Sequence, residues 1–241
     1  MKNANGSLAR NFCAQQLENG SAILVAFALL TASNLVAPEL STADIVTDFT
    51  ATADGRTRTF GEDTVETMAA RLSVVQSGGL VDNVILEFDI SAIGAANTLS
   101  AASLVLVHDG FLSNIGQTPV PLETFVYAGD GVVDIDDFDA AGVNAGNFSV
   151  PLDSVSDGDQ LVFDFTDLTE FQSIIDAGTG LVTVRLETNS FATIQFASLE
   201  NTSFAAPVLR LESVPEPSSA GFAMLVSGLL VCRRRSRGNI G

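Results

Sequence analysis

Short runs of β-forming residues, separated by turn signals, limit the folds open to residues 44–213. The runs are rich in Val, Ile, Leu, Phe and Thr and cover residues 71–75, 84–90, 103–108, 122–127, 160–164, 181–187, 193–196 and 208–212. In several of them apolar and polar residues alternate, as Leu209 and Leu211 do with Arg210 and Glu212. Such alternation is typical of strands with one buried and one solvent-exposed face. We therefore expect a β-rich body.

Turn and helix signals complete this pattern. Turns are indicated at four pairs that contain glycine, Gly78-Gly79, Asp109-Gly110, Asp130-Gly131 and Asp157-Gly158, which makes His108 a turn residue. One helix is expected, with a capping box of Asp167 and Glu170 at its start and Gly178 at its end. Many short strands with one helix favour an all-β domain over residues 44–213, a two-sheet antiparallel β-sandwich of the jelly-roll type.

The N-terminal segment has the pattern of a signal peptide. Lys2 and Arg10 precede an uncharged apolar run over residues 22–30, which is too short to span a ~30 Å hydrocarbon core. Ser41 and Ala43 then provide small residues in front of Asp44, as a cleavage site requires. We expect residues 1–43 to direct export and to be removed; the alternative is a buried core helix.

The C-terminal segment combines three elements in a fixed order. A proline-containing motif comes first, an apolar stretch over residues 220–232 follows, and a basic cluster ends the chain; the motif and cluster are Pro215, Glu216, Pro217, Arg233, Arg234, Arg235 and Arg237. Arginines beside an apolar segment favour a cytoplasmic C-terminus. This order resembles the PEP-CTERM sorting signal, which exosortase, a membrane-bound processing enzyme, recognises in bacteria with an outer membrane. The alternative is an ordinary tail anchor.

The resemblance implies a sorting tail over residues 214–241 that contains a transmembrane helix. It also implies that the export machinery and exosortase are partners, that the precursor is held transiently in the inner membrane, and that the tail is removed or exchanged. Systems of this kind commonly accompany extracellular polysaccharide production.

A second resemblance covers much of the body. The segment Leu-Glu-Phe-Asp-Ile-Ser over residues 86–91, followed by Leu-Ser-Ala-Ala-Ser-Leu-Val-Leu over residues 99–106, resembles the DNRLRE-type domain. Residues 195–200 and 207–211 are similar to the closing strands of that family. The family is a β-sandwich of secreted bacterial proteins and is related to carbohydrate-binding modules. It therefore implies a sandwich and an extracellular polysaccharide as ligand.

Charge and residue counts exclude several function classes. Residues 44–213 hold 26 of the 29 Asp and Glu residues but five of the 11 Lys and Arg residues, a net charge of about −21. Nucleic acid is therefore not expected as a partner, because binding it requires a basic surface. Cys13 and Cys232 both lie outside the body, and one histidine cannot build a multi-histidine metal site.

Calcium is the one cofactor that the acidic residues suggest as a candidate. Residues 129–138 look like the second half of an EF-hand loop, but the positions that should carry its first carboxylates are Val126 and Ala128. This excludes a complete EF-hand. A partial calcium site remains possible, and the alternative is a solvated acidic turn. The candidate ligands are Asp130, Asp134, Asp136, Asp137 and Asp139.

The remaining residues give weak evidence for a sugar-binding surface and none for catalysis. Sugars are usually held against Tyr or Trp, and the chain has no Trp and one Tyr, Tyr127, which is our candidate ligand contact. Several phenylalanines, Phe88, Phe125, Phe163 and Phe165, alternate with polar residues as core residues do. No catalytic residue is proposed, because the body has no Gly-x-Ser-x-Gly motif and its carboxylates are too numerous to single out a pair.

Together these features predict an exported, non-catalytic protein of the cell surface or extracellular matrix. The first alternative is a carbohydrate-binding module for an extracellular polysaccharide. The second, less favoured, is a polysaccharide hydrolase or lyase.

Overall fold

The computed structural model describes residues 44–114 and 119–215. The signal peptide expected over residues 1–43 and the sorting tail from Glu216 onward lie outside these residues. Twelve strands make up most of the described chain: β1 (Ile45–Thr50), β2 (Ala53–Phe60), β3 (Glu62–Glu66), β4 (Arg71–Ser77), β5 (Leu80–Asp89), β6 (Asn97–Asn114), β7 (Val120–Ala128), β8 (Val143–Val150), β9 (Gln160–Asp164), β10 (Leu181–Glu187), β11 (Ala192–Ala197) and β12 (Val208–Pro215).

Three short helical segments connect the strands. The α-helix α2 (Thr169–Ala177) lies between β9 and β10, and the 3₁₀ helices η1 (Ile135–Phe138) and η2 (Leu152–Ser154) flank β8. The predicted all-β class is therefore confirmed, since the described residues form a mostly antiparallel sheet with one α-helix.

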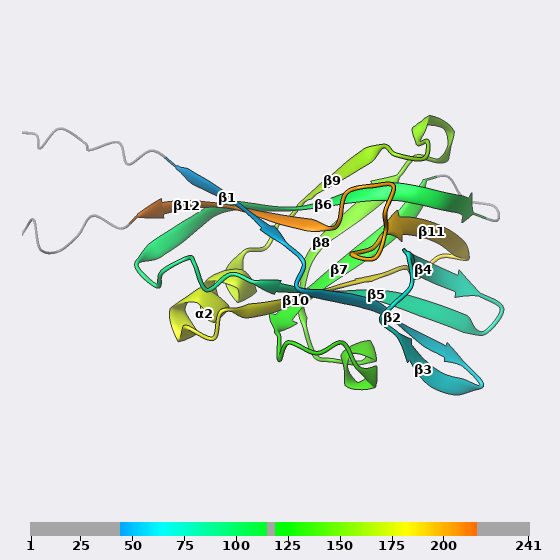
Figure 1. The fold of residues 1–241 in the computed structure, drawn as a ribbon, viewed down its shortest axis with the longest axis horizontal. Helices are drawn as coiled ribbons and strands as arrows, with labels where there is room; N and C mark the ends of the chain where they lie inside the picture. The colour runs from blue at the N-terminus through cyan, green and yellow to red at the C-terminus, as the bar shows by residue number, and fades with distance from the viewer. Residues whose placement is uncertain (1–43, 115–118, 216–241) are drawn as a thin grey trace, which may run out of the picture. The chain divides into compact units, whose positions relative to one another are not determined.

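The strands form one curled sheet in the order β1-β12-β6-β11-β4-β5-β10-β7-β8, with β2 beside β5, β3 beside β2, and β9 beside β6. The 18-residue strand β6 joins its two parts, because Ser103 pairs with β12 and β9 whereas His108 pairs with Phe196 of β11. The sheet curls so that β1, β12 and β6 lie across from β5 and β10 (Figure 1). Phe163 of β9 thereby meets Phe196, with ring centroids 6.2 Å apart.

Side-chain alternation explains where the core lies. Leu72 and Val74 of β4 and Leu209 and Leu211 of β12 are buried in a single hydrophobic cluster, as their alternation with polar residues predicts. The helix α2 adds Phe171, Ile174 and Ile175 to this cluster. Burial of this apolar area is the main favourable contribution to folding.

The expected aromatic core is confirmed with one exception. Phe88, Phe163 and Phe165 are buried in the cluster. Phe125 is only half-buried and lies outside it, because its ring packs under the guanidinium group of Arg185, 5.0 Å from the ring centroid. Alternation alone assigned Phe125 to the wrong face of β7.

The structure also corrects two local predictions. The Asp109-Gly110 pair is not a turn: β6 continues through it, with Gly110 at φ +113°, a conformation that glycine tolerates. The helix α2 has no capping box, since it begins at Thr169, whose backbone N–H donates to the Asp167 carboxylate (2.9 Å). Its predicted end is confirmed, with Gly178 in the left-handed conformation.

Strands β1 and β8 were not predicted from the sequence. Strand β8 contains two Asn residues and a Gly, which have low β-propensity, so its local pattern does not indicate a strand and its pairing with β7 makes it one. Strand β1 consists of β-forming residues apart from Asp48, so its signal was present and was missed; it pairs with β12.

Replacing Phe196 tests whether the contact between the two parts of the curled sheet stabilises the fold. We expect Phe196→Ala to lower the free energy of unfolding by about 3–5 kcal/mol, because the ring is fully buried between β9 and β4 neighbours. Phe60→Ala is the matched control: Phe60 is 66% exposed, and we expect a change below about 0.5 kcal/mol. Urea unfolding of both variants measures the difference, and equal losses would contradict this account of the core.

Candidate functional site

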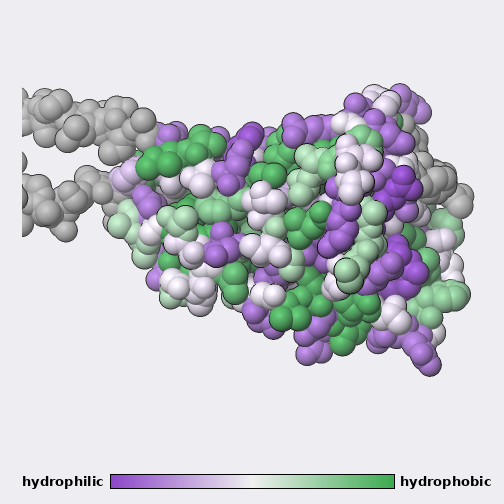
Figure 2. All heavy atoms as spheres, in the orientation of Figure 1, coloured by the Kyte–Doolittle hydropathy of each residue, from purple (hydrophilic) through white to green (hydrophobic). Residues whose placement is uncertain are grey.

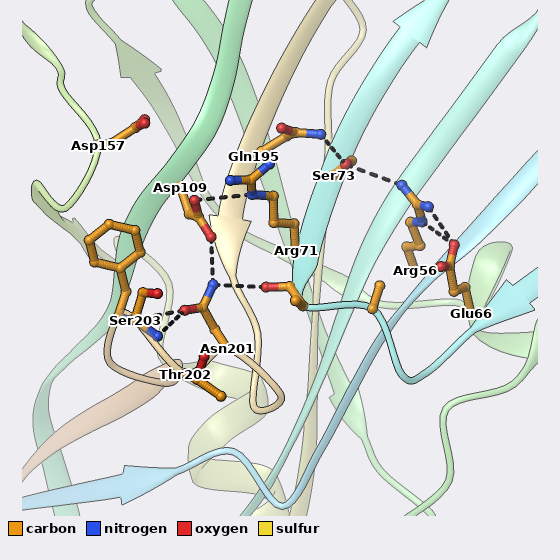
Figure 3. A pocket seen from close by; sticks show the side chains of 13 residues that line it. Arg56, Glu66, Arg71, Ser73, Asp109, Asp157, Gln195, Asn201, Thr202 and Ser203 are labelled. Carbon is orange, nitrogen blue, oxygen red and sulfur yellow. Dashed lines mark hydrogen bonds and ion pairs between the residues drawn. The ribbon is translucent and has the colours of Figure 1, made fainter.

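A polar cleft of about 620 Å³ opens on the outer side of β4 and is the candidate functional site (Figure 3). Its volume falls in the range of small-ligand sites. Strands β2, β3, β4, β6 and β11 contribute side chains to it, together with the connection from β3 to β4, the loop from β11 to β12 and the turn before β9. The lining residues are Arg56, Glu66, Ala69, Ala70, Arg71, Ser73, Asp109, Asp157, Gln195, Asn201, Thr202, Ser203 and Phe204.

Strand alternation places the cleft behind the core. Leu72 pairs in register with Phe196, and both side chains are buried in the hydrophobic cluster. The neighbouring pair Ser73 and Gln195 therefore points to the opposite face. There the Gln195 amide Nε2 donates to Ser73 Oγ (3.1 Å), so a cross-strand hydrogen bond forms part of the cleft floor.

One wall of the cleft is built around Asp109. The Nε atom of Arg71 lies 3.0 Å from Asp109 Oδ1, and the side-chain amide of Asn201 donates to Asp109 Oδ2 (Figure 3). Asn201 in turn shapes its own loop, because its Oδ1 accepts the backbone N–H groups of Ser203 (2.8 Å) and Phe204 (2.9 Å). Three segments that are distant in sequence are thus held in one fixed arrangement.

The opposite wall is an ion pair of the β2–β3 hairpin. Arg56 donates through both Nε and Nη2 to the Glu66 carboxylate, and its Nη1 donates to Ser73 Oγ (3.3 Å). Its Nη1 also lies 3.7 Å from Asp82, a fully buried carboxylate that accepts two hydrogen bonds from Arg58. Strands β2 and β3 pair antiparallel and form this hairpin.

The third side of the cleft is the turn that carries Asp157. Its carboxylate accepts the backbone N–H of Gly110 (2.9 Å) and lies 3.4 Å from the Nδ1 atom of His108. His108 is buried within β6, so the expectation that it is a turn residue is wrong. Gly158, which follows Asp157 in the turn, has φ +90° and packs against Phe204, since a Cβ there would lie 3.0 Å from the Phe204 ring. The turn and the loop therefore support each other.

A buried carboxyl group anchors the start of the cleft loop. Asp54 of β2 accepts the backbone N–H of Leu199 (2.7 Å), two residues before Asn201. Burial raises the pKa of Asp54 to about 7, with a smaller contribution from the nearby charge of Glu200. The loop is therefore tied to β2 by a group that changes charge near neutral pH.

A second buried polar network lies outside the cleft. Glu87 of β5 is fully buried and accepts a hydrogen bond from the hydroxyl of Thr183, and burial raises the pKa of Glu87 to about 7. Tyr127, the candidate ligand contact, is also buried here: its hydroxyl donates to Asp137 Oδ1 (2.9 Å). Arg185 donates to the backbone carbonyl oxygen of Asp137 (3.0 Å). Tyr127 therefore does not line the cleft.

The acidic residues considered as calcium ligands surround η1: Asp130, Asp134, Asp136, Asp137 and Asp139. Asp130 and Asp134 each accept a backbone N–H two residues later, at 2.9 and 2.8 Å, and Asp137 accepts the N–H of Asp134 (2.9 Å). Asp136 and Asp139 are exposed. Across residues 44–114 and 119–215, no group of three or more His, Cys, Asp or Glu is placed to hold a metal ion. A calcium site here stays a prediction.

Of the predicted sorting motif, the structure describes Pro215, which ends β12 and pairs with Asn97 of β6. Glu216, Pro217 and the arginine cluster lie outside the described residues. Within the described part of the chain, no helix is long and apolar enough to cross a membrane.

Comparison with known proteins adds no assignment. No protein-family model matches the chain, and no curated protein matches it significantly.

The cleft residues were not identified from the sequence. They come from five strands and three connecting segments, and each looks like an ordinary outward-facing residue of its own strand or loop. Phe204 is the one aromatic side chain in the lining, and it lies in a loop without any motif. The only sequence signal was indirect: two of the five arginines of an acidic body, Arg56 and Arg71, both line this cleft.

The raised pKa values predict how stability depends on pH. Asp54 and Glu87 have pKa values of about 7 in the folded protein, against about 4 for ordinary carboxyl groups in an unfolded chain. The folded state therefore binds more protons between these values, and its stability falls as pH rises through that window.

We expect the melting temperature to be about 5 °C higher at about pH 5.5 than at about pH 8. Asp54→Asn and Glu87→Gln should each reduce this difference. Asp89→Asn is the control, because hydrogen bonds from Ser91 lower the pKa of Asp89 and its titration lies below the tested range. Differential scanning calorimetry measures the effect, and a melting temperature that rises with pH would refute it.

Proposed function

We propose that this protein is an exported, non-catalytic component of the cell surface or extracellular matrix whose body binds an extracellular polysaccharide in the polar cleft. The curled sheet is interpreted as a two-sheet, jelly-roll-like sandwich. The observation that carries the proposal is the convergence of Arg71, Asp109, Asn201 and Gln195 from separate strands and a loop into one wall and floor. Figure 2 shows hydrophilic residues on the right of the view, where Figure 1 places β4 and β11.

The chemistry of the lining supports a sugar ligand. A sugar hydroxyl both donates and accepts hydrogen bonds, and the cleft offers the guanidinium donors of Arg71 beside carboxylate acceptors. The ion pairs already fix these side chains, so little conformational entropy is lost when a ligand binds. Phe204 adds one apolar face, which suits the C–H face of a sugar ring.

The buried carboxyl groups support a non-catalytic role. General acid catalysis by a carboxyl group at neutral pH requires a raised pKa and access to substrate. Asp54 and Glu87 have pKa values raised to about 7, but both are buried and neither lines the cleft. A hydrolase or lyase is therefore the least favoured reading.

A second candidate is a matrix role through protein partners. Among the described residues, β1 is hydrogen-bonded on one side, to β12, so its other edge is open. Ile45 and Val46 on this edge strand are 48% and 55% exposed, and Figure 2 shows a hydrophobic patch there. Exposed apolar edge strands are common sites of association between chains.

A matched pair of arginine variants tests the cleft. Arg71 and Arg210 are both exposed and each is paired with an aspartate, but Arg71 lines the cleft and Arg210 lies on β12. Native gels cast with a panel of polysaccharides first identify a polymer that slows the migration of the unaltered protein. We expect Arg71→Ala to migrate through that polymer without being slowed, because the substitution removes a hydrogen-bond donor and leaves Asp109 without its arginine partner. Arg210→Ala should leave the retardation unchanged.

Gln195→Ala provides a second cleft variant if Arg71→Ala proves unstable, and thermal melting checks the folding of each. Calcium and chelator in parallel gels show whether a metal contributes. Binding that survives both cleft substitutions would move the function away from the cleft. An absence of binding to any polymer would favour the partner-binding role.

The export and sorting proposal has its own test. It rests on the apolar run over residues 22–30 and on the motif and basic cluster at the C-terminus. In a bacterium that carries an exosortase, we expect replacement of Arg233, Arg234, Arg235 and Arg237 by alanine to leave an unprocessed precursor in the membrane fraction. The unaltered chain should be processed and reach the cell surface. Immunoblots of cell fractions measure this, and identical processing of both forms would contradict a PEP-CTERM-type signal.

A further inference from the structure

We infer that the cleft selects uncharged glycan chains and excludes polyanionic ones such as polyuronates and sulfated glycans. This inference rests on the proposed glycan-binding function and specifies its ligand class. It follows from the fact that the arginine side chains in the cleft are already paired with carboxylates of the protein. Two guanidinium groups, Arg56 and Arg71, share the lining with three carboxylates, Glu66, Asp109 and Asp157.

Arg56 is not available to bind an anion. Its Nε and Nη2 atoms both donate to Glu66, and its Nη1 atom donates to Ser73 and faces the buried carboxylate of Asp82 at 3.7 Å. Its side chain is 18% exposed. An incoming carboxylate or sulfate would have to displace Glu66 to form a two-pronged contact, and would leave that carboxylate without its partner.

Arg71 is accessible, but carboxylates neutralise its charge. Its Nε atom contacts Asp109 at 3.0 Å, and Asp157 is close enough to attract it as well. The side chain is 54% exposed, so its terminal nitrogens can donate hydrogen bonds into the cleft. Arg71 therefore acts as a donor group within a neutralised pair and not as a free cation.

Asp157 gives the cleft a surplus of negative charge. Its side chain is 60% exposed, and its carboxylate accepts the backbone N–H of Gly110. Within the described residues, no arginine forms an ion pair with Asp157. The body around the cleft carries a net charge of about −21, which repels a polyanion before contact.

An uncharged glycan meets none of these penalties. Its hydroxyls can accept from the terminal nitrogens of Arg71 and donate to Asp109 and Asp157, so donors and acceptors on both sides are matched. A polyanion would instead bring its own negative groups close to the three carboxylates of the lining, which repel them. The same side chains therefore bind an uncharged glycan and exclude a polyanionic one.

Pairs of polymers that share one backbone test this inference. Dextran against dextran sulfate, hydroxyethyl cellulose against carboxymethyl cellulose, and carboxyl-reduced polygalacturonate against polygalacturonate are immobilised on biosensor tips and probed with the protein at about pH 8. At low salt we expect the uncharged member of the recognised pair to bind at least about tenfold more tightly than the anionic member.

Asp157→Asn sharpens the test, because it removes the surplus charge and keeps an oxygen that can accept the Gly110 N–H. We expect this variant to bind the anionic member about threefold to tenfold better than the unaltered protein does, so that the ratio of the two affinities shifts toward the anionic member. Asp89→Asn is the matched control: Asp89 also accepts a backbone N–H at 2.9 Å, from Ser91, but lies outside the cleft lining.

The outcomes separate the two levels of the proposal. Tighter binding of the anionic member at low salt, lost in Arg71→Ala, would overturn the inference and leave glycan binding in the cleft intact. Equal gains in Asp157→Asn and Asp89→Asn would also overturn it, because the general charge of the body would then be the cause. If neither member of any pair bound, glycan binding itself would fail, and the inference with it.

Discussion

The long strand β6 is the element on which the rest of the structure depends. Its first part is hydrogen-bonded to β12 and β9, and its last part to β11. Because one continuous strand belongs to both parts of the sheet, the sheet must curl, and Phe163 can then pack against Phe196 across the core. Gly110 permits this strand to run on where a turn would otherwise end it.

The two faces of β4 and β11 link stability to binding. Leu72 and Phe196 are paired on the core side, and the adjacent pair of Ser73 and Gln195 forms the cleft floor. The buried side chains of Leu72 and Phe196 therefore fix the positions of their neighbours Ser73 and Gln195 in the cleft floor. This explains how a cleft built from polar side chains can be rigid before a ligand binds. It also explains why a register shift in β11 would disrupt the core packing and the cleft floor together.

Local periodicity was enough to predict the β class, most strands and the end of α2 at Gly178, because these depend on neighbouring residues. Periodicity could not assign Phe125 to the outer face, where Arg185 from another strand covers it. It could not predict the cleft either. Asp109 binds Asn201 from 92 residues away, Asn201 binds Ala70 from 131 residues away, and these contacts exist only because three segments meet in the fold.

Carboxylates take the place of covalent cross-links in fixing the cleft. Neither Cys13 nor Cys232 lies among the described residues, so no disulfide can hold the loop that carries Asn201. Instead Asp54 binds its start at Leu199, and Asp109 binds Asn201 itself. The hydrogen bond from Asn201 to Asp109 is charge-assisted, and such bonds are stronger than neutral ones. The acidic composition of the body therefore has a structural use beyond solubility: its buried carboxylates position the loop, while exposed ones such as Asp157 set which ligands can approach it.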